Sequence, residues 1–240
     1  MLTDLIFDFF GTLVGYDRDR FHGDARRAFA YLRSQGFPLE YPEYAARFDL
    51  AFRELERTAA ITCREFHMDV AAETLFAATG WQASDRTRDR FVSLFVEEWN
   101  QGTVFLDGIA GFLSRLASRY RLSVLSNSNY PPVIHDNLRA MGVAPLFSQI
   151  VVSADLGIRK PSPEIFRHTL RLLDARSETA LYVGDTYDHD YLGAQAAYLR
   201  CCLIDAPGQH VDRSVLRIDH LFQLPTVLAG LERAAAPGQS

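Results

Sequence analysis

Polar residues able to do chemistry lie after four short apolar runs of this sequence. They are Asp8, Ser126 with Asn127, Lys160, and Asp185. Apolar runs of this length are typical of buried strands, and open α/β folds bind ligands at the carboxyl ends of such strands. We therefore expect Asp8 at a ligand-binding edge, although a carboxylate in that place can also cap a helix.

Lys160 is the only lysine among 25 basic residues, the others being arginines. It stands directly before Pro161-Ser162-Pro163. A lysine ahead of a helix is ordinarily a solvated charge, whereas a lysine beside a buried carboxylate supplies a fixed positive charge for an anionic substrate. We predict the second role for Lys160.

Taken in order, the motifs resemble those of the haloacid dehalogenase superfamily. They are Asp8-Phe9-Phe10-Gly11-Thr12, Leu125-Ser126-Asn127, Gly157-x-x-Lys160-Pro161-x-Pro163-x-x-Phe166 and Gly184-Asp185-x-x-x-x-Asp190-x-x-Gly193-Ala194. The resemblance covers essentially the whole chain, and it implies a hydrolase.

The resemblance implies catalytic and phosphate-binding roles. Asp8 is implied to be the nucleophile, and Lys160 the charge that counters repulsion between Asp8 and an anionic substrate. Ser126 is implied to bind an oxyanion; a helix start is the structural alternative for its polar cluster. Thr12 and Asn127 are further candidates for phosphate binding.

The resemblance also implies a Mg²⁺ site. Its ligands would be the carboxylates of Asp8 and Asp185 and the main-chain carbonyl of Phe10. Oxygen ligands of this kind suit Mg²⁺, which keeps several waters or phosphate oxygens. Asp190 is expected to orient Lys160 or a metal-bound water from outside the ligand set.

Phe10 departs from the phosphatases of this superfamily, which carry a second aspartate there as general acid/base. Phosphonatases, which lack that acid, need a cap lysine, and the expected cap contains none. The 2-haloacid dehalogenases carry an aromatic residue there, but they have Ser where Asp185 stands and Asn where Tyr187 stands. An unneutralised Asp185 beside Asp8 would be repulsive, so we expect a site built around a cation.

Two residues just past the first motif are candidates for substrate recognition or proton transfer from a cap. Arg20 could bind an anionic substrate, and His22 could move a proton. A solvated surface position is the alternative for both residues.

The elements that must position these residues change character along the chain. Apolar residues at helical spacing predict helices over 25–34, 44–60, 70–79 and 87–98. From about 105 onward strands and helices alternate, and the last of these helices is expected near 189–198. We therefore predict an α/β fold, a doubly wound Rossmann-like parallel sheet with an inserted helical cap of C1 type. The expected core is 1–15 and 101–233, the cap 16–100, and a flexible tail 234–240. Two sequential domains are the alternative, but they would leave the first strand without partners.

Composition narrows the class of protein. The net charge of −5 gives no electrostatic reason to expect nucleic acid, and no run approaches the length of a membrane span. Three cysteines form neither a disulfide framework nor a metal-ligand spacing. We expect a cytoplasmic protein, a monomer or homodimer, that takes a small-molecule substrate.

The residues and the resemblance together predict a Mg²⁺-dependent phosphohydrolase that acts through an aspartyl-phosphate on a small phosphorylated metabolite. The alternatives are a 2-haloacid dehalogenase-type hydrolase and a catalytically impaired protein that binds phosphorylated metabolites.

Overall fold

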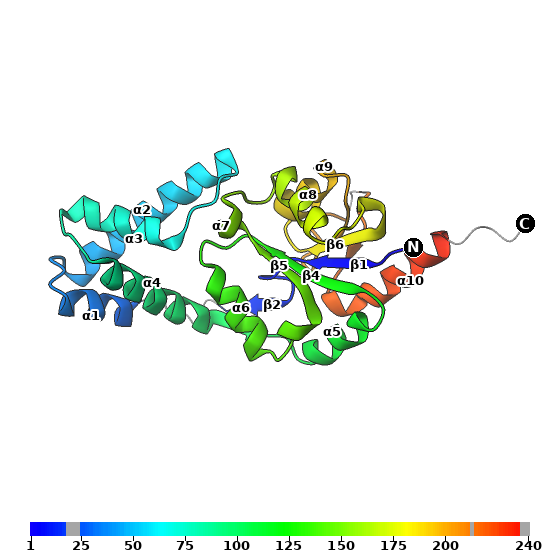
Figure 1. The fold of residues 1–240 in the computed structure, drawn as a ribbon, viewed down its shortest axis with the longest axis horizontal. Helices are drawn as coiled ribbons and strands as arrows, with labels where there is room; N and C mark the ends of the chain where they lie inside the picture. The colour runs from blue at the N-terminus through cyan, green and yellow to red at the C-terminus, as the bar shows by residue number, and fades with distance from the viewer. Residues whose placement is uncertain (18–24, 212–213, 236–240) are drawn as a thin grey trace, which may run out of the picture.

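A six-stranded parallel sheet with the strand order β5-β4-β1-β6-β7-β8 forms the centre of the computed structural model (Figure 1). The structure describes residues 1–17, 25–211 and 214–235. The strands are β1 (Asp4–Phe7), β4 (Arg121–Ser126), β5 (Phe147–Val152), β6 (Ala180–Gly184), β7 (Arg200–Ile204) and β8 (Arg217–Ile218). The chain adds β4 and β5 on one side of β1, and then β6, β7 and β8 on the other. Such a reversal opens a crevice at the carboxyl ends of the strands, and the predicted doubly wound fold is confirmed.

Strand β1 divides its side chains between two apolar clusters. Leu5 and Phe7 pack into the larger cluster and Ile6 into the smaller, and all three are fully buried. Successive side chains of a strand point to opposite faces, so a strand covered on both faces is apolar throughout. The larger cluster includes residues of α5 (Ile109–Ala117), α6 (Pro131–Ala140) and α10 (Leu224–Ala235), and the smaller includes residues of α8 (Pro163–Leu172) and α9 (Gly193–Ala196).

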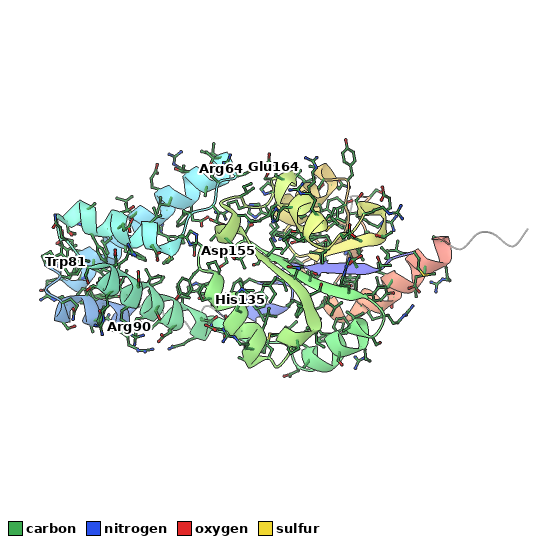
Figure 2. All side chains as sticks on the ribbon, in the orientation of Figure 1. Arg64, Trp81, Arg90, His135, Asp155 and Glu164 are labelled. Atoms are coloured by element: carbon green, nitrogen blue, oxygen red, sulfur yellow. The ribbon has the colours of Figure 1, made fainter. Side chains whose placement is uncertain are left out.

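Four helices between residues 26 and 99 form a separate unit beside the sheet (Figure 1). They are α1 (Arg26–Ser34), α2 (Tyr41–Thr62), α3 (Met68–Thr79) and α4 (Asp85–Trp99). Aromatic rings fill the space between them; Phe91, for example, packs edge-on against Phe48 with ring centroids 5.8 Å apart. Trp81 lies at the end of this unit far from the sheet (Figure 2). The four helices predicted from apolar spacing are confirmed.

A short antiparallel pair joins the two ends of the helical unit. Strand β2 (Val14–Tyr16) pairs with β3 (Thr103–Phe105), although 86 residues separate the end of one from the start of the other. Residue 102 is a glycine where the Tyr16 ring packs against the backbone, because a Cβ at this position would come within 2.6 Å of that ring. The helical unit thus enters and leaves the core at one place, while the domain boundaries stay a prediction.

Several elements differ from the sequence expectations. The helix predicted over 189–198 is instead a wider π-helical turn, η4 (Tyr187–Leu192), followed by the short α9. Residues 234 and 235 were predicted to belong to a flexible tail but lie in α10, which continues to Ala235, and the rest of that predicted tail is outside the described residues. The other short elements are η1 (Asn100–Gly102), η2 (Ala144–Leu146), α7 (Ser153–Leu156), η3 (Ser177–Thr179) and η5 (Leu221–Gln223). Across the described ranges, the helices are too short or too polar to span a bilayer.

Candidate active site

Three neighbouring strands deliver the predicted site residues to one edge of the sheet. Asp8 follows β1, Ser126 ends β4 and Asp185 follows β6, and β1 lies between the other two strands. The backbone N–H of Asp8 donates to the carbonyl of Val183 at 2.9 Å, which fixes the start of the Asp8 loop against β6. The strand order therefore brings together residues that are far apart in the sequence.

Lys160 lies at the centre of this cluster and is 3% exposed. Its Nζ donates to Asp8 Oδ1 at 2.7 Å, to Asp190 Oδ1 at 2.6 Å and to the Tyr182 hydroxyl at 2.8 Å. Burial alone would lower the pKa of Lys160, but the adjacent Asp190 and Asp8 outweigh burial and raise it. All three ammonium protons are used, which holds the ammonium group in place beside Asp8. The role of Lys160 toward a substrate stays a prediction.

The loop that carries Lys160 is held by reciprocal hydrogen bonds to Asn127. The backbone N–H of Lys160 donates to Asn127 Oδ1 at 2.8 Å, and Asn127 Nδ2 donates to the Lys160 carbonyl at 3.0 Å. Ser162 then caps α8, with Pro163 at its first position. Asn127 was predicted to bind phosphate, and in this structure its amide group positions the main chain of Lys160.

Tyr182 belongs to the cluster and was missed in the sequence. Its ring is fully buried within β6, and its hydroxyl donates to Asp190 Oδ1 at 2.9 Å. The other oxygen of Asp190 accepts from the backbone N–H of Thr186 at 2.9 Å. The signal available in the sequence was a single hydroxyl-bearing side chain inside an otherwise apolar strand.

Asp8, Asp185 and Asp190 each offer a carboxylate oxygen, and these oxygens lie within 4.8 Å of one another. Asp185 Oδ1 is buried with no hydrogen-bond partner among the described residues. Both oxygens of Asp190, by contrast, already accept hydrogen bonds from protein groups. Hard oxygen donors, one of them an unsatisfied carboxylate oxygen, fit a divalent cation. Asp8 and Asp185 are the two carboxylates of the cluster that remain available as its ligands.

Two glycines make this crowding of acids feasible. Gly11 has φ +83°, and a Cβ on it would collide with the Asp185 carboxylate. A Cβ on Gly184 would collide in the same way with Asp190. Both motif glycines therefore leave room for a carboxylate, and Gly11 also adopts a backbone conformation that favours glycine.

The electrostatics of the site make Asp8 unusual. Burial raises its pKa to about 7; Lys160 opposes this rise, while Asp190 and Asp185 add to it. Burial, and then Asp190, also raise the pKa of Asp185. One lysine therefore does not fully compensate three clustered carboxylates, and a second cation would favour their ionised forms.

Ser126 and Thr12 are both nearly fully buried at this edge. Within the described part of the chain, the Ser126 hydroxyl has only a long hydrogen bond, 3.4 Å, to the carbonyl of Asn127. The Thr12 hydroxyl has no partner among the described residues. Both hydroxyls thus retain hydrogen-bonding capacity for a ligand, and their roles stay predictions.

A cavity of about 370 Å³ lies next to the cluster, between the helical unit and the sheet edge. Phe10 and Asn127, from the first and second motifs, form part of its lining together with Trp99 of α4. Phe10 packs edge-on against Trp99, with ring centroids 5.2 Å apart. The position that holds a second acid in phosphatases of the resembled superfamily is therefore occupied here by an aromatic ring, which forms part of the apolar cavity wall.

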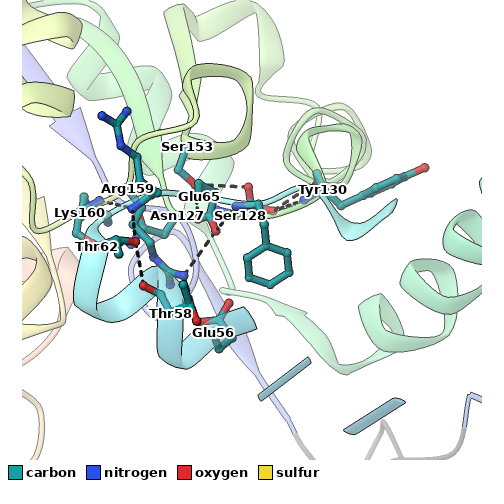
Figure 3. Close-up of polar contacts among 12 residues, drawn as sticks. Glu56, Thr58, Thr62, Glu65, Asn127, Ser128, Tyr130, Ser153, Arg159 and Lys160 are labelled. Atoms are coloured by element: carbon teal, nitrogen blue, oxygen red, sulfur yellow. Dashed lines mark hydrogen bonds and ion pairs between the residues drawn. The ribbon is translucent and has the colours of Figure 1, made fainter. Parts of the chain in front are cut away.

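The loop after α2 connects the helical unit to the motif loops (Figure 3). Arg159 pairs with Glu56 at 3.0 Å and with Glu65 at 3.4 Å. The hydroxyl of Ser153 donates to Glu65 at 2.6 Å and accepts from the backbone N–H of Ser128 at 2.9 Å. The contacts of Glu56 and Glu65, which sequence analysis missed, join residues that are 88 to 103 positions apart. Arg20 and His22 lie outside the described residues.

Comparison with known proteins gives the same family at two levels. A family model described as haloacid dehalogenase-like hydrolase matches residues 5–197. Among solved structures, a 2-haloacid dehalogenase from Pseudomonas syringae superposes with a TM-score of 0.75 at 26% identity, covering 96% of this chain and 100% of that one.

Two curated relatives are phosphatases. A glyceraldehyde 3-phosphate phosphatase from Methanothermobacter thermautotrophicus is 31% identical over 117 residues, 45% of this chain and 51% of that protein. A phosphoserine phosphatase from Thermus thermophilus is 30% identical over 140 residues, 58% of this chain and 55% of that protein. The alignments thus span about half the length of these relatives. Because the family match covers most of the chain, from β1 to the end of α9, this protein belongs to the haloacid dehalogenase-like hydrolases.

Proposed function

We propose that this protein is a Mg²⁺-dependent phosphohydrolase. The observation that carries the proposal is the unpartnered, buried carboxylate oxygen of Asp185 in a cluster of three acids and one lysine. The ligand set would be Asp8, Asp185 and the main-chain carbonyl of Phe10. Mg²⁺ bound there would supply positive charge that favours ionised Asp8 and offsets the negative charge of a phosphoryl group.

Asp8 is the proposed nucleophile. An oxygen of its carboxylate attacks phosphorus in line, the bond from phosphorus to the leaving-group oxygen breaks, and an aspartyl-phosphate forms. Water then hydrolyses this acyl phosphate and regenerates Asp8. Lys160 holds Asp8 Oδ1 and places a positive charge beside the transferring group. Ser126 and Thr12 have unused hydroxyl capacity for the phosphate oxygens.

The leaving group receives little help from this site. General acid catalysis typically contributes about 10²–10⁴-fold to the rate, and the residue two positions after Asp8 is Phe10, whose ring packs on Trp99. Substrates whose leaving group departs without protonation are therefore favoured over alkyl phosphates.

The test is phosphate release from acetyl phosphate with Mg²⁺, with EDTA, and after Asp8→Asn. We expect activity with Mg²⁺, none in EDTA, and a loss of at least about 10³-fold in Asp8→Asn. The matched control is Asp188→Asn, because Asp188 is exposed in the turn after β6 and should leave turnover unchanged. Full activity in EDTA would refute the metal requirement.

A 2-haloacid dehalogenase is the second candidate. It is favoured by the aromatic Phe10 and by the full-length structural similarity to the Pseudomonas syringae dehalogenase. Halide release from 2-haloacids that persists in EDTA, with no phosphate released from acetyl phosphate, would select this candidate over the phosphohydrolase.

A further inference from the structure

The cavity beside the Asp8 cluster is part of the same site. Its lining includes Phe10, two residues after Asp8, and Arg159, which directly precedes Lys160. Asn127 also lines it and holds the main chain of Lys160. A phosphoryl group bound at Asp8 would therefore direct the rest of its molecule toward this cavity.

Aromatic rings form one wall of the cavity. Trp99 is stacked on Tyr16, with ring centroids 4.8 Å apart, and packs edge-on against Phe10. The Tyr16 hydroxyl donates to the Trp99 carbonyl at 3.0 Å, so both rings are fixed. Phe52 and Phe95 continue the apolar lining from α2 and α4. A volume of about 370 Å³ is within the range of small-molecule pockets.

The charged groups of the cavity are already engaged with one another. Among the described lining residues Arg159 is the sole basic side chain, and it pairs with both Glu56 and Glu65. Nη1 of Arg159 contacts both carboxylates, so two acids offset its positive charge, and those carboxylates would repel a second anionic group. The carboxylate oxygens of Glu65 also accept hydrogen bonds from Ser153 and from the backbone N–H of Phe66.

Resting on the proposed phosphohydrolase function, we infer that the substrates are phosphate esters of an uncharged phenol, that is, aryl phosphates. The ring occupies the aromatic cavity while the phosphoryl group meets Asp8. When Asp8 attacks phosphorus, the ester bond breaks and the aryl oxygen keeps the electron pair. The aryl oxide leaves and takes a proton from water, so the step needs no acid at the position of Phe10.

The test compares kcat/KM of the wild-type protein with Mg²⁺ on five probes: acetyl phosphate, phenyl phosphate, 2-naphthyl phosphate, 4-carboxyphenyl phosphate and phosphoserine. We expect 2-naphthyl phosphate to exceed phenyl phosphate by about tenfold, because the second ring buries more apolar surface. We expect 4-carboxyphenyl phosphate to fall about tenfold below phenyl phosphate, because its added carboxylate meets Glu56 and Glu65.

Trp99→Ala locates the preference in this cavity. It should lower the ratio of 2-naphthyl to acetyl phosphate turnover by about tenfold. Trp81→Ala is the matched control, since Trp81 packs on Phe76 at the far end of the helical unit (Figure 2) and should leave that ratio unchanged. The wild-type series decides the inference even where Trp99→Ala does not fold.

The two proposals fail in different ways. Absence of Mg²⁺-dependent phosphate release from every probe overturns the proposed function. Hydrolysis of acetyl phosphate with no preference for 2-naphthyl over 4-carboxyphenyl phosphate overturns the aryl assignment and leaves the phosphohydrolase standing. Faster turnover of phosphoserine than of phenyl phosphate, or an equal fall of the ratio in Trp81→Ala, also overturns the aryl assignment.

Discussion

The ring of Phe10 has two consequences at once, because it forms part of the cavity wall and leaves no acid beside the leaving group. An enzyme without that acid should depend steeply on how readily the leaving-group oxygen carries negative charge. Phenyl and benzyl phosphate test this dependence, since both carry one ring but release a phenoxide and an alkoxide, respectively.

Phe10→Asp should narrow the gap between those two substrates. In the wild-type protein we expect phenyl phosphate to be turned over at least about 10²-fold faster than benzyl phosphate. In Phe10→Asp the ratio of kcat values should fall by about tenfold or more, because a carboxylic acid can protonate the alkoxide. An unchanged ratio in a folded, Mg²⁺-binding variant would show that protonation is not what the site lacks.

Asp185 makes a second prediction at this scale, because its carboxylate is crowded by Asp8 and Asp190. In metal-free protein, at a pH above the raised pKa of Asp8, Asp185→Asn should increase the free energy of unfolding by about 1 kcal/mol through relief of repulsion. Mg²⁺ at roughly 100 times its dissociation constant should stabilise the wild type by about 2.7 kcal/mol and leave Asp185→Asn unaffected. Urea unfolding with and without Mg²⁺ measures both effects, with Asp188→Asn as control; equal stabilisation of all three proteins would contradict the ligand assignment.

Among the elements, the loop after α2 decides how the helical unit meets the core. The helix ends at Thr62; the next residue, Cys63, has φ 52°, and its carbonyl accepts from the N–H of Arg159 at 3.1 Å. Glu65 then reaches Ser153, which directly follows β5. Backbone and side-chain hydrogen bonds therefore attach one loop of the helical unit directly to the segment that carries Lys160.

Glu65 gives this contact a pH dependence. Burial raises its pKa above the ordinary value of 4.5, although Ser153 and Arg159 oppose the rise. The folded protein thus holds this proton more tightly than the unfolded chain. The contribution of protonated Glu65 to the free energy of unfolding is therefore complete below pH 4.5 and is lost as the pH rises through the raised pKa. The difference in free energy of unfolding between wild type and Glu65→Gln should therefore fall with rising pH across that window and then stay level.

Urea unfolding over a series of pH values measures this difference. Glu54→Gln, on the exposed side of α2, is the matched control, because its effect on the free energy of unfolding should change with pH in the opposite direction. A hydrogen bond from Arg57 lowers the pKa of Glu54. The contribution of ionised Glu54 to the free energy of unfolding is therefore present above pH 4.5, its ordinary pKa, and is lost as the pH falls. A Glu65→Gln difference that does not vary with pH would contradict the assignment.

Over the whole molecule, the sequence predicted best what local patterns determine. Apolar runs that end at a carboxylate with a glycine nearby located Asp8 and Asp185. The single lysine of the sequence, directly before Pro-x-Pro, located Lys160. The contacts of Tyr182 and Arg159 and the stacking of Tyr16 on Trp99 depend on strand order and helix docking; Tyr16 and Trp99 are 83 positions apart in the sequence. No local spacing encodes such pairs. The roles of Arg20 and His22 remain predictions.

The three hydrogen bonds of Lys160 also affect how the folded chain responds to amine-directed chemistry. Its one lysine is 3% exposed, and its protons are committed to Asp8, Asp190 and Tyr182. Acylation of that amine requires both exposure and deprotonation, and the native fold opposes each of them. Reaction of the lysine ε-amine would therefore report opening of the surroundings of Asp8, so this one residue can be used to follow whether the site is intact.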